Sequence, residues 1–582
     1  MNDASFAGSV EVERDLTCRA PDGAALRADV YRPTEAGPHP ALLLRLPYGK
    51  TGADSDVAMV HPAWIARLGF VVVVQDVRGR WSSEGEFFPF RHEAADGHAA
   101  INWTAGLDAC DGRVISYGFS YPGLIQLLAA ARAPRALVGM CPAFTGSQVY
   151  EGWAYRGGAL TGFTVEWALE MGLDGARRAN DHSAFQALRS QLASRDAWFA
   201  YESGSELDRA VNTYSPWLEQ WCRHPHDDGF WDEWNAENLY SQIGVPALHV
   251  GGWWDHFVGG TIRNFEGLRA EATTSTARAG QRLVLGPWRH MPWTPTGEPH
   301  AAPAHPPPAG PEIVDLHVEW WRQIFYGEPA PSLAAPIRVW VSGERWRELE
   351  EWPSDQATTT LYLHSGGRAA TRFGDGRLDD AAPADELPDV VAYDPWMVAA
   401  RQGGHGCCLA EVSPMGPACQ CGAEESPSLL VYTSGALRDP VVLLGDVWVD
   451  VWMSADAPSV DLCARLCVVD TDGCSTNLLE GVRRVRTARP GDGNHVHPPG
   501  CHRVALGPVG RQLASGERLR LDLAGADHPL WDLNLTTDEA WTPTRKSFGA
   551  TATQVIFHDA TRPSVLRLPT ADTALWPSAT GR

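Results

Sequence analysis

Hydrophobic and polar positions follow two alternating periods along residues 1–143. Short apolar runs rich in valine and leucine predict buried strands, and the runs between them have the spacing of helices. The strand-like runs are HPALLLRLPYG, GFVVVVQDVRG and RVISYGFS, and the helix-like runs are HPAWIARLG and HEAADGHAAINWTAG. This alternation is typical of an α/β domain with a mostly parallel sheet.

The strand pattern stops at about residue 144 and returns at about residue 240. Residues 144–239 are helical, aromatic and polar, which predicts an inserted helical cap. Strand-like runs resume in VPALHVGGWWD and QRLVLGPWRH, so the α/β domain is predicted to comprise 1–143 and 240–333. The proline-rich stretch 292–312 predicts a surface loop, and the helix-like run IVDLHVEWWRQIFYG closes this domain.

From about residue 334 the pattern changes to many short alternating strands separated by turn residues. Examples are PIRVWVSG, TTTLYLHSGG, GDVWVDVWMSAD and RLRLDLAGAD. Regularly spaced short strands without helices between them predict an all-β sandwich or jelly-roll domain over 334–582.

The length and charge of the chain limit the kinds of molecule that it is expected to bind. A chain of 582 residues is too long for one core, and its formal net charge of −23 disfavours nucleic acid or an anionic membrane as partner. The first residues lack the basic start and apolar run of a signal peptide. The sequence contains no uninterrupted apolar run of about 18 residues, the length that a membrane-spanning helix needs. These features predict a cytoplasmic protein whose partner is a small molecule, and they are compatible with a homo-oligomer. We expect neither a cofactor nor a metal.

Ser120 lies where a strand-like run gives way to a helix-like run, in GFSYPG. A serine on such a turn is either a nucleophile on a strained elbow or an ordinary helix N-cap. The usual elbow pattern is G-x-S-x-G, but here Pro122 occupies the second glycine position and Gly123 follows it. The local sequence leaves both interpretations open.

Two later segments supply the partners that a nucleophilic serine needs. Asp255 follows the strand-like run that ends at GG in VPALHVGGWWDHF, and His290 follows the one that ends at GP in RLVLGPWRH. Such positions lie at the carboxyl edge of the sheet, and the order serine, aspartate, histidine is that of α/β-hydrolases. His249 lies within a predicted strand and His256 adjoins Asp255, so His290 is the better candidate for the general base.

These segments resemble the cocaine esterase and X-prolyl dipeptidyl peptidase family of serine hydrolases. The motifs that carry the resemblance are RLPYGK, DVRGRWSSEGEF, GFSYPG, GWWD, GPWRH, YDPWMVAARQGG, LLVYTSGAL and HDATRPSVLRLP. The resemblance implies an α/β-hydrolase domain with a helical cap and a C-terminal jelly roll. It assigns Ser120 as nucleophile, His290 as base and Asp255 as its orienting partner, with an oxyanion hole formed by Tyr48 and the Tyr121 N–H.

A group of cysteines departs from the family pattern. Cys419 in GPACQCG stands where relatives often carry an acidic residue, and His405, Cys407, Cys408 and Cys421 lie nearby in the sequence. Zinc is one interpretation, but Cys407 and Cys408 are adjacent and Cys419 and Cys421 are closer than the usual knuckle spacing. Reduced structural thiols or one disulfide fit this spacing better.

The resemblance and the aromatic content suggest a substrate class. Trp153, Trp167 and Phe257 match the aromatic walls that the esterase branch places around the acyl group. No carboxylate closely follows Asp255, which disfavours a substrate ammonium, although Glu151 or Glu166 of the cap would change this if it entered the pocket. The sequence therefore predicts hydrolysis of an ester or amide of a bulky, uncharged acyl group.

Three other activities stay open at this point. An acyltransferase or cyclising enzyme uses the same acyl-enzyme, and a dry, tryptophan-rich pocket favours it. An acylase or X-prolyl-type peptidase uses the same residues on an amide bond. A catalytically idle protein that binds carbohydrate through its jelly roll is the third, and an intact set of Ser120, Asp255, His290 and Tyr48 argues against it.

Overall fold

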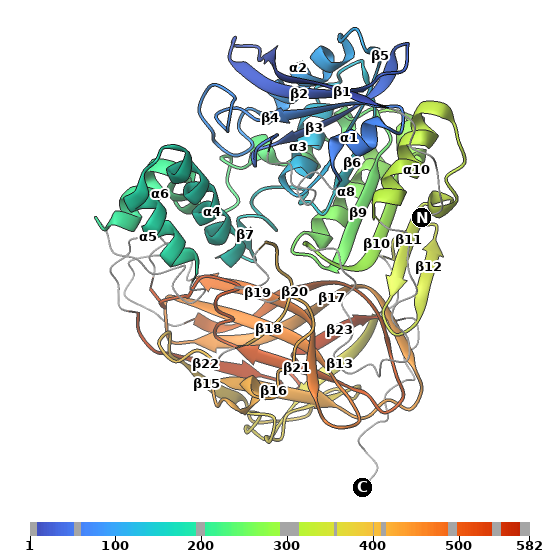
Figure 1. The fold of residues 1–582 in the computed structure, drawn as a ribbon. Helices are drawn as coiled ribbons and strands as arrows, with labels where there is room; N and C mark the ends of the chain where they lie inside the picture. The colour runs from blue at the N-terminus through green and yellow to red at the C-terminus, as the bar shows by residue number, and fades with distance from the viewer. Residues whose placement is uncertain are drawn as a thin grey trace.

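The computed structural model describes residues 9–51, 60–193, 204–291, 313–353, 358–399, 401–408, 415–486, 497–537 and 549–570. The α/β domain lies at the top of Figure 1 and the β domain below it, and the helices α4 to α6 form a third body at their side. The predicted proline-rich loop 292–312 lies outside the described residues. The predicted α/β-hydrolase domain followed by an all-β domain is confirmed.

The α/β domain is built on a ten-stranded mixed sheet whose central strands are parallel. In sheet order its strands are β1 (Val10–Arg19), β2 (Ala25–Pro33), β4 (Val71–Asp76), β3 (His39–Leu46), β5 (Cys110–Phe119), β6 (Leu137–Ala143), β9 (Leu248–Trp254), β10 (Arg282–Arg289), β11 (Ile337–Val341) and β12 (Arg345–Leu349).

Helices cover both faces of this sheet. Along β3, Leu43 packs into one core with the helix α3, while Leu42 and Leu44 pack into the opposite core with α1 and α10. This explains the continuous apolar runs, because a strand between two helical layers buries successive side chains on opposite faces. The helices of this domain are α1 (Pro62–Ala66), α2 (Glu93–Ala105), α3 (Tyr121–Ala130), α8 (Val258–Glu271), α9 (Ser275–Ala279) and α10 (Ile313–Tyr326).

The cap elements lie between β6 and β9, which are neighbours in the sheet. The chain therefore leaves the sheet, forms the cap and returns to the adjacent position, as expected of an insertion. The cap elements are β7 (Tyr155–Arg156), β8 (Ala159–Leu160), α4 (Gly162–Arg178), α5 (His182–Leu192), α6 (Glu206–Tyr214), α7 (Trp217–Cys222), η2 (Asp232–Trp234) and η3 (Ala236–Gln242).

The structure differs from the predicted boundary at residue 334. The run PIRVWVSG forms β11, which pairs in parallel with β10, and β12 pairs with β11, so both strands extend the α/β sheet. An alternating run five residues long fits the edge of either sheet, and its local pattern does not specify the pairing partner.

The β domain contains a second sheet of eleven strands. Its order is β15, β22, β17, β23, β13, β14, β16, β21, β18 and β19, and β20 pairs with β17. Alternate residues of β17, such as Val447, Val449 and Val451, point into its apolar core, as a period of two requires. The strands are β13 (Thr358–His364), β14 (Arg377–Asp379), β15 (Asp389–Tyr393), β16 (Leu429–Ser434), β17 (Val441–Ala455), β18 (Ser459–Val469), β19 (Ser475–Arg486), β20 (His497–Leu513), β21 (Arg518–Ala524), β22 (Ala552–Phe557) and β23 (Val565–Pro569), with short helices η4 (Pro331–Leu333) and η5 (Ala423–Glu425).

Among the described helices, none combines the length and the apolar character that a membrane span requires.

Candidate active site

Ser120 lies on a strained turn between β5 and α3. It is the N-cap residue of α3 with φ 65° and ψ −128°, and its side chain makes no capping hydrogen bond. A non-glycine residue at positive φ stores strain that the surrounding structure must maintain. The Ser120 N–H donates to the Ala143 carbonyl (3.0 Å) and the Thr145 hydroxyl donates to the Ser120 carbonyl (2.8 Å), so the end of β6 holds this turn.

Two glycines allow the turn to form, and they explain the spacing of GFSYPG. A Cβ on Gly118 would lie 2.7 Å from side-chain atoms of Leu44 and Pro122. A Cβ on Gly123 would lie 2.7 Å from Cβ of Thr145 and 3.0 Å from the Ala143 carbonyl. Gly123 is thus the position where α3 approaches the end of β6, which is why the second glycine comes one residue later here.

His290 and Asp255 form a buried pair at the ends of β10 and β9. His290 Nδ1 lies 2.7 Å from Asp255 Oδ1, and both side chains are at most 1% exposed. The rings of Phe119 and Phe257 pack against the imidazole, with centroids 5.8 and 5.3 Å away. Because Phe119 directly precedes Ser120, this packing ties the histidine to the serine turn.

His249 and His256, the other two candidates for the general base, both have a lowered pKa. His249 is buried within β9 and bonds Gln281 Oε1 through Nε2 (3.0 Å), and burial lowers its pKa to about 4. Burial and the positive charge of Arg156 lower the pKa of His256 to about 3. His256 lines a cleft of about 290 Å³ at the junction of the cap, the α/β domain and the β domain.

Tyr48 follows β3, and its phenol lies close enough to the Ser120 side chain for the two to interact. Burial and the negative charge of Glu170 raise the pKa of this phenol, so it stays protonated and can donate. The Arg80 guanidinium donates to the Pro47 carbonyl (2.9 Å) and the Lys50 N–H donates to Asp76 (2.7 Å). The motifs RLPYGK and DVRG therefore meet to fix the Tyr48 loop.

The Tyr121 side chain is anchored away from Ser120. Its hydroxyl donates to Glu93 Oε1 (2.9 Å) and accepts the Phe90 N–H (3.1 Å), and Glu93 is also paired with Arg45. The backbone N–H of Tyr121 lies at the first position of α3, where an N–H has no acceptor within the helix. Of the polar groups of Tyr121, the hydroxyl is therefore engaged elsewhere and the backbone N–H is the one that adjoins Ser120.

Trp153, Trp167 and Phe257 belong to one aromatic cluster under the cap. Trp153 packs against Phe257 (centroids 4.5 Å) and Trp167 (5.9 Å), and Trp167 packs against Tyr121 (5.9 Å). Trp153 and Trp167 are at most 1% exposed. The structure therefore brings all three predicted residues together, in contact with rings that adjoin Ser120 and His290.

A pair of carboxyl groups on α4 lies close to the site. Burial and the charge of Glu166 raise the pKa of Glu170 to about 8, and the charge of Glu170 acts in turn on Tyr48. Glu170 was not a sequence candidate, although its position one helical turn after Glu166 was a signal for it. Glu151, the other cap carboxylate considered, lines the cleft beside His256.

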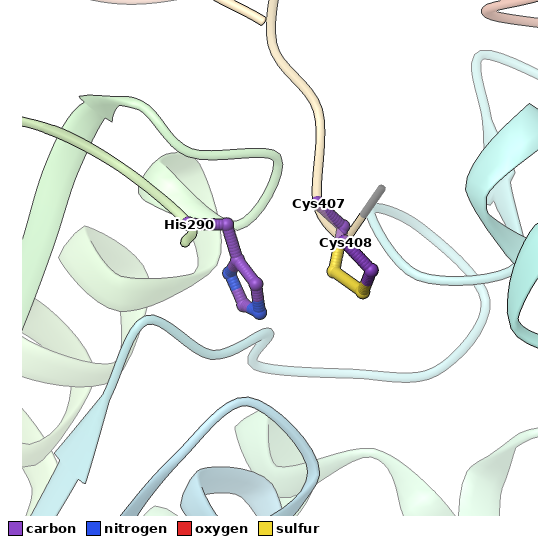
Figure 2. A group of neighbouring side chains, drawn as sticks. All are labelled: His290, Cys407 and Cys408. Atoms are coloured by element: carbon purple, nitrogen blue, oxygen red, sulfur yellow. A yellow bond between two sulfur atoms is a disulfide. The ribbon is translucent and has the colours of Figure 1, made fainter. Parts of the chain in front are cut away.

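The predicted cysteine group separates into two places. Cys407 and Cys408 form a disulfide, and their sulfur atoms and a ring nitrogen of His290 all lie within 4.8 Å of one another (Figure 2). His405 instead bonds Glu480 through Nδ1 (2.8 Å). Cys419 and Cys421 lie elsewhere, beside Cys474, so the five residues form no single zinc site. Gly404 and Gly416 form an antiparallel bridge, a contact that the linear spacing of the two cysteine pairs did not reveal.

Comparisons with known proteins identify the family. The model of the X-Pro dipeptidyl-peptidase S15 family matches residues 22–292, and the model of the X-Pro dipeptidyl-peptidase C-terminal non-catalytic domain matches residues 332–567. The chain belongs to the S15 family. This S15 protein is 28% identical to a cocaine esterase of Rhodococcus sp. (strain MB1 Bresler), over 97% of this chain and 99% of that protein.

Solved structures share the fold along nearly the whole chain. An aminopeptidase from a marine sediment Thaumarchaeota archaeon is 18% identical, with a TM-score of 0.76 over 98% of this chain and 97% of that one. An α-amino acid ester hydrolase is 19% identical, with a TM-score of 0.77 over 98% of both chains. The family and the cocaine esterase homologue identify this S15 protein as a serine hydrolase acting on ester or amide bonds.

Proposed function

We propose that this S15 protein hydrolyses its substrate through an acyl-enzyme on Ser120. The observation that carries the proposal is the buried His290–Asp255 bond of 2.7 Å next to the strained Ser120 turn. Ser120 Oγ attacks the carbonyl carbon and passes its proton to His290 Nε2, while Asp255 accepts from Nδ1–H and orients the ring. His290 then protonates the leaving group, and water repeats the sequence to release the acid.

Tyr48 and the backbone N–H of Tyr121 are the proposed oxyanion donors. The raised pKa of the Tyr48 phenol keeps its proton available, and the start of α3 favours negative charge. Each donor of this kind stabilises the developing oxyanion by about 2.7 to 4 kcal/mol. Metal or cofactor chemistry has no role in this proposal.

The proposed substrate is an ester or amide with a bulky, uncharged acyl group. Trp153, Trp167 and Phe257 form one aromatic cluster that adjoins Tyr121 and His290, and this cluster suits an aromatic or alicyclic acyl group. Water is the proposed acceptor of the acyl group. Product analysis with added alcohols or amines would reveal acyl transfer or cyclisation if one of them intercepted the acyl-enzyme instead.

The carboxyl pair on α4 favours one second candidate. A substrate ammonium near Tyr48 would be attracted by this carboxyl pair and would favour the ionised form of Glu170, as an aminoacyl ester hydrolase or an X-prolyl-type peptidase requires. Comparing kcat/KM for a benzoyl ester and a phenylglycyl ester with the same leaving group separates the two. A tenfold preference for the phenylglycyl ester, about 1.4 kcal/mol in transition-state binding, would contradict the uncharged-acyl proposal.

Covalent labelling tests the reaction itself. A fluorophosphonate should label the protein on Ser120, and Ser120→Ala should abolish labelling and turnover while the circular dichroism spectrum stays unchanged. Ser116→Ala is a matched control, because Ser116 is also a buried serine of this segment, on β5. Labelling of another residue, or persistent turnover in Ser120→Ala, would contradict the proposal.

A further inference from the structure

Three cysteines of the β domain converge on one point outside the active site. Cys419, Cys421 and Cys474 bring their Sγ atoms within 4.8 Å of one another, and the Cys419 and Cys474 sulfurs are 3.3 Å apart. Cys474 comes from the turn that joins β18 and β19, more than fifty residues after the other two. The distance of Cys474 from the other two along the chain concealed its place in this group.

The backbone around these sulfurs is held in place independently of them. Gln420 N–H donates to the Ser475 carbonyl (2.8 Å), and Cys419 forms a β-bridge with Thr476, so the two segments are already paired. Ser475 N–H also donates to Cys421 Sγ (3.3 Å). A site whose ligands are positioned by the backbone needs little ordering when it binds an ion.

We propose that Cys419, Cys421 and Cys474 form a binding site for a thiophilic divalent cation such as Zn²⁺. Zinc takes thiolate ligands at about 2.3 Å in a tetrahedron, which puts ligand sulfurs roughly 3.8 Å apart. The observed separations, from 3.3 Å to at most 4.8 Å, bracket this value. Cys419 is exposed and the other two are partly exposed, so solvent reaches the site and water supplies the fourth ligand.

The binding step is balanced by proton release. Three thiols and one Zn²⁺ give a tris-thiolate complex and three protons, with no change of oxidation state. In a reducing compartment the three cysteines stay as free thiols and are available for this step.

The bound ion would stabilise a segment that reaches the active site. The Gln420 side chain donates to the Gln402 carbonyl (2.7 Å), and Arg465 bonds both Gln402 and Gln420. A few residues further on, the Gly406 carbonyl accepts the N–H of His256, next to Asp255. An ion at the three cysteines therefore anchors the loop that carries Cys407 and Cys408 to the vicinity of His290.

Cobalt titration of the full-length protein tests the site. The protein is reduced, treated with chelator and titrated with Co²⁺ under nitrogen, and thiolate ligation is read from the sulfur-to-cobalt charge-transfer band. We expect one equivalent of Co²⁺ to give this band, Zn²⁺ to abolish it, and Cys474→Ser to weaken Co²⁺ binding at least tenfold. Cys501→Ser, an exposed cysteine on β20, is the matched control and should bind as the unmodified protein does.

Two further measurements keep the result unambiguous. Cys408→Ser should retain the band, because the pair beside His290 is a different site. A band that is absent in the reduced protein, or that persists when Cys474→Ser is combined with Cys408→Ser, would overturn the proposal. A Cys419–Cys474 disulfide in protein purified without reductant, seen as a mass lower by two hydrogens that persists after metal addition, would also overturn it.

Discussion

The Tyr48 phenol depends on several residues that do not touch substrate. Gly49 has φ 103° and a Cβ there would lie 2.5 Å from the Trp81 ring, while Arg80 and Asp76 hold the backbone on either side. A side-chain donor has to be fixed before the reaction begins, since an oxyanion exists only briefly. The loop therefore determines whether the phenol acts as a donor.

Removing the Tyr48 hydroxyl should slow acylation without preventing binding. In Tyr48→Phe the ring stays but the oxyanion donor is lost, so kcat should fall by about 10²- to 10³-fold while KM changes little. Pre-steady-state release of the leaving group measures this directly. Tyr117→Phe, which removes another buried phenol, should stay active, and equal rates in the two variants would make Tyr48 a structural residue.

Glu170 should impose an alkaline limit on activity. Burial and Glu166 raise its pKa to about 8, so it is neutral at pH 7 and ionises as the pH rises through 8. The new charge next to Tyr48 opposes the oxyanion, so kcat should decline above about pH 8 in the unmodified protein. Glu170→Gln cannot ionise and should keep its rate there.

The control for this pH profile is Glu219→Gln, which removes an exposed carboxylate of α7. It should decline above pH 8 as the unmodified protein does. An alkaline decline that is the same in Glu170→Gln would show that another group causes it.

At the scale of elements, the contact between α3 and the end of β6 shapes the serine turn. The Ser120 N–H, the Ser120 carbonyl and Gly123 all contact residues 143–145. A helix can follow a strand this abruptly only if the neighbouring strand accepts its first turn closely. The strain at Ser120 is therefore maintained by packing between two elements rather than by its own sequence.

Gly123→Ala should disturb this contact. The added methyl group would overlap Thr145 and the Ala143 carbonyl, and overpacking of this kind costs about 1 to 3 kcal/mol. We expect a lower midpoint of thermal unfolding and a slower rate of fluorophosphonate labelling. Gly139→Ala on β6, whose nearest neighbours are at an ordinary 3.5 Å, should change neither, and unchanged labelling in Gly123→Ala would refute this role of Gly123.

At the scale of the whole molecule, the cap is attached to the β domain as well as to the α/β domain. The Arg484 N–H of β19 donates to the Gly157 carbonyl (2.8 Å), and the Gly162 N–H donates to the Leu530 carbonyl (2.8 Å). Arg156 also donates to the Leu506 carbonyl (3.0 Å). The cap that carries Trp153, Trp167 and Glu170 is thus positioned from two sides.

Gly157→Ala should loosen the cap from the β domain. Gly157 has φ 53° and a Cβ there would collide with the Val482 carbonyl. Gly23→Ala is the matched control, because Gly23 has φ 95° and open space, so it carries the backbone strain of about 1 kcal/mol without the collision. Gly157→Ala should raise KM and lower the unfolding midpoint further than Gly23→Ala, and equal effects would count against a role of this contact.

The sequence by itself predicted the two-domain architecture, the insertion and the candidate residues Ser120, Asp255 and His290. These predictions rest on local periodicity and on the order of strand ends, because a strand between two helical layers must be apolar on both faces. Residues just past such strands meet at one edge of the sheet whatever the details of packing. That regularity made the candidate site predictable before any contact was known.

Only the tertiary structure decided which distant segments meet. β11 and β12 joined the α/β sheet, Cys474 joined Cys419 and Cys421, and Glu170 came to lie near Tyr48. Each of these contacts joins residues far apart in the chain or from different elements. Pairing partners and the charge around a buried group depend on the neighbours that folding brings together, and a local pattern carries no information about them.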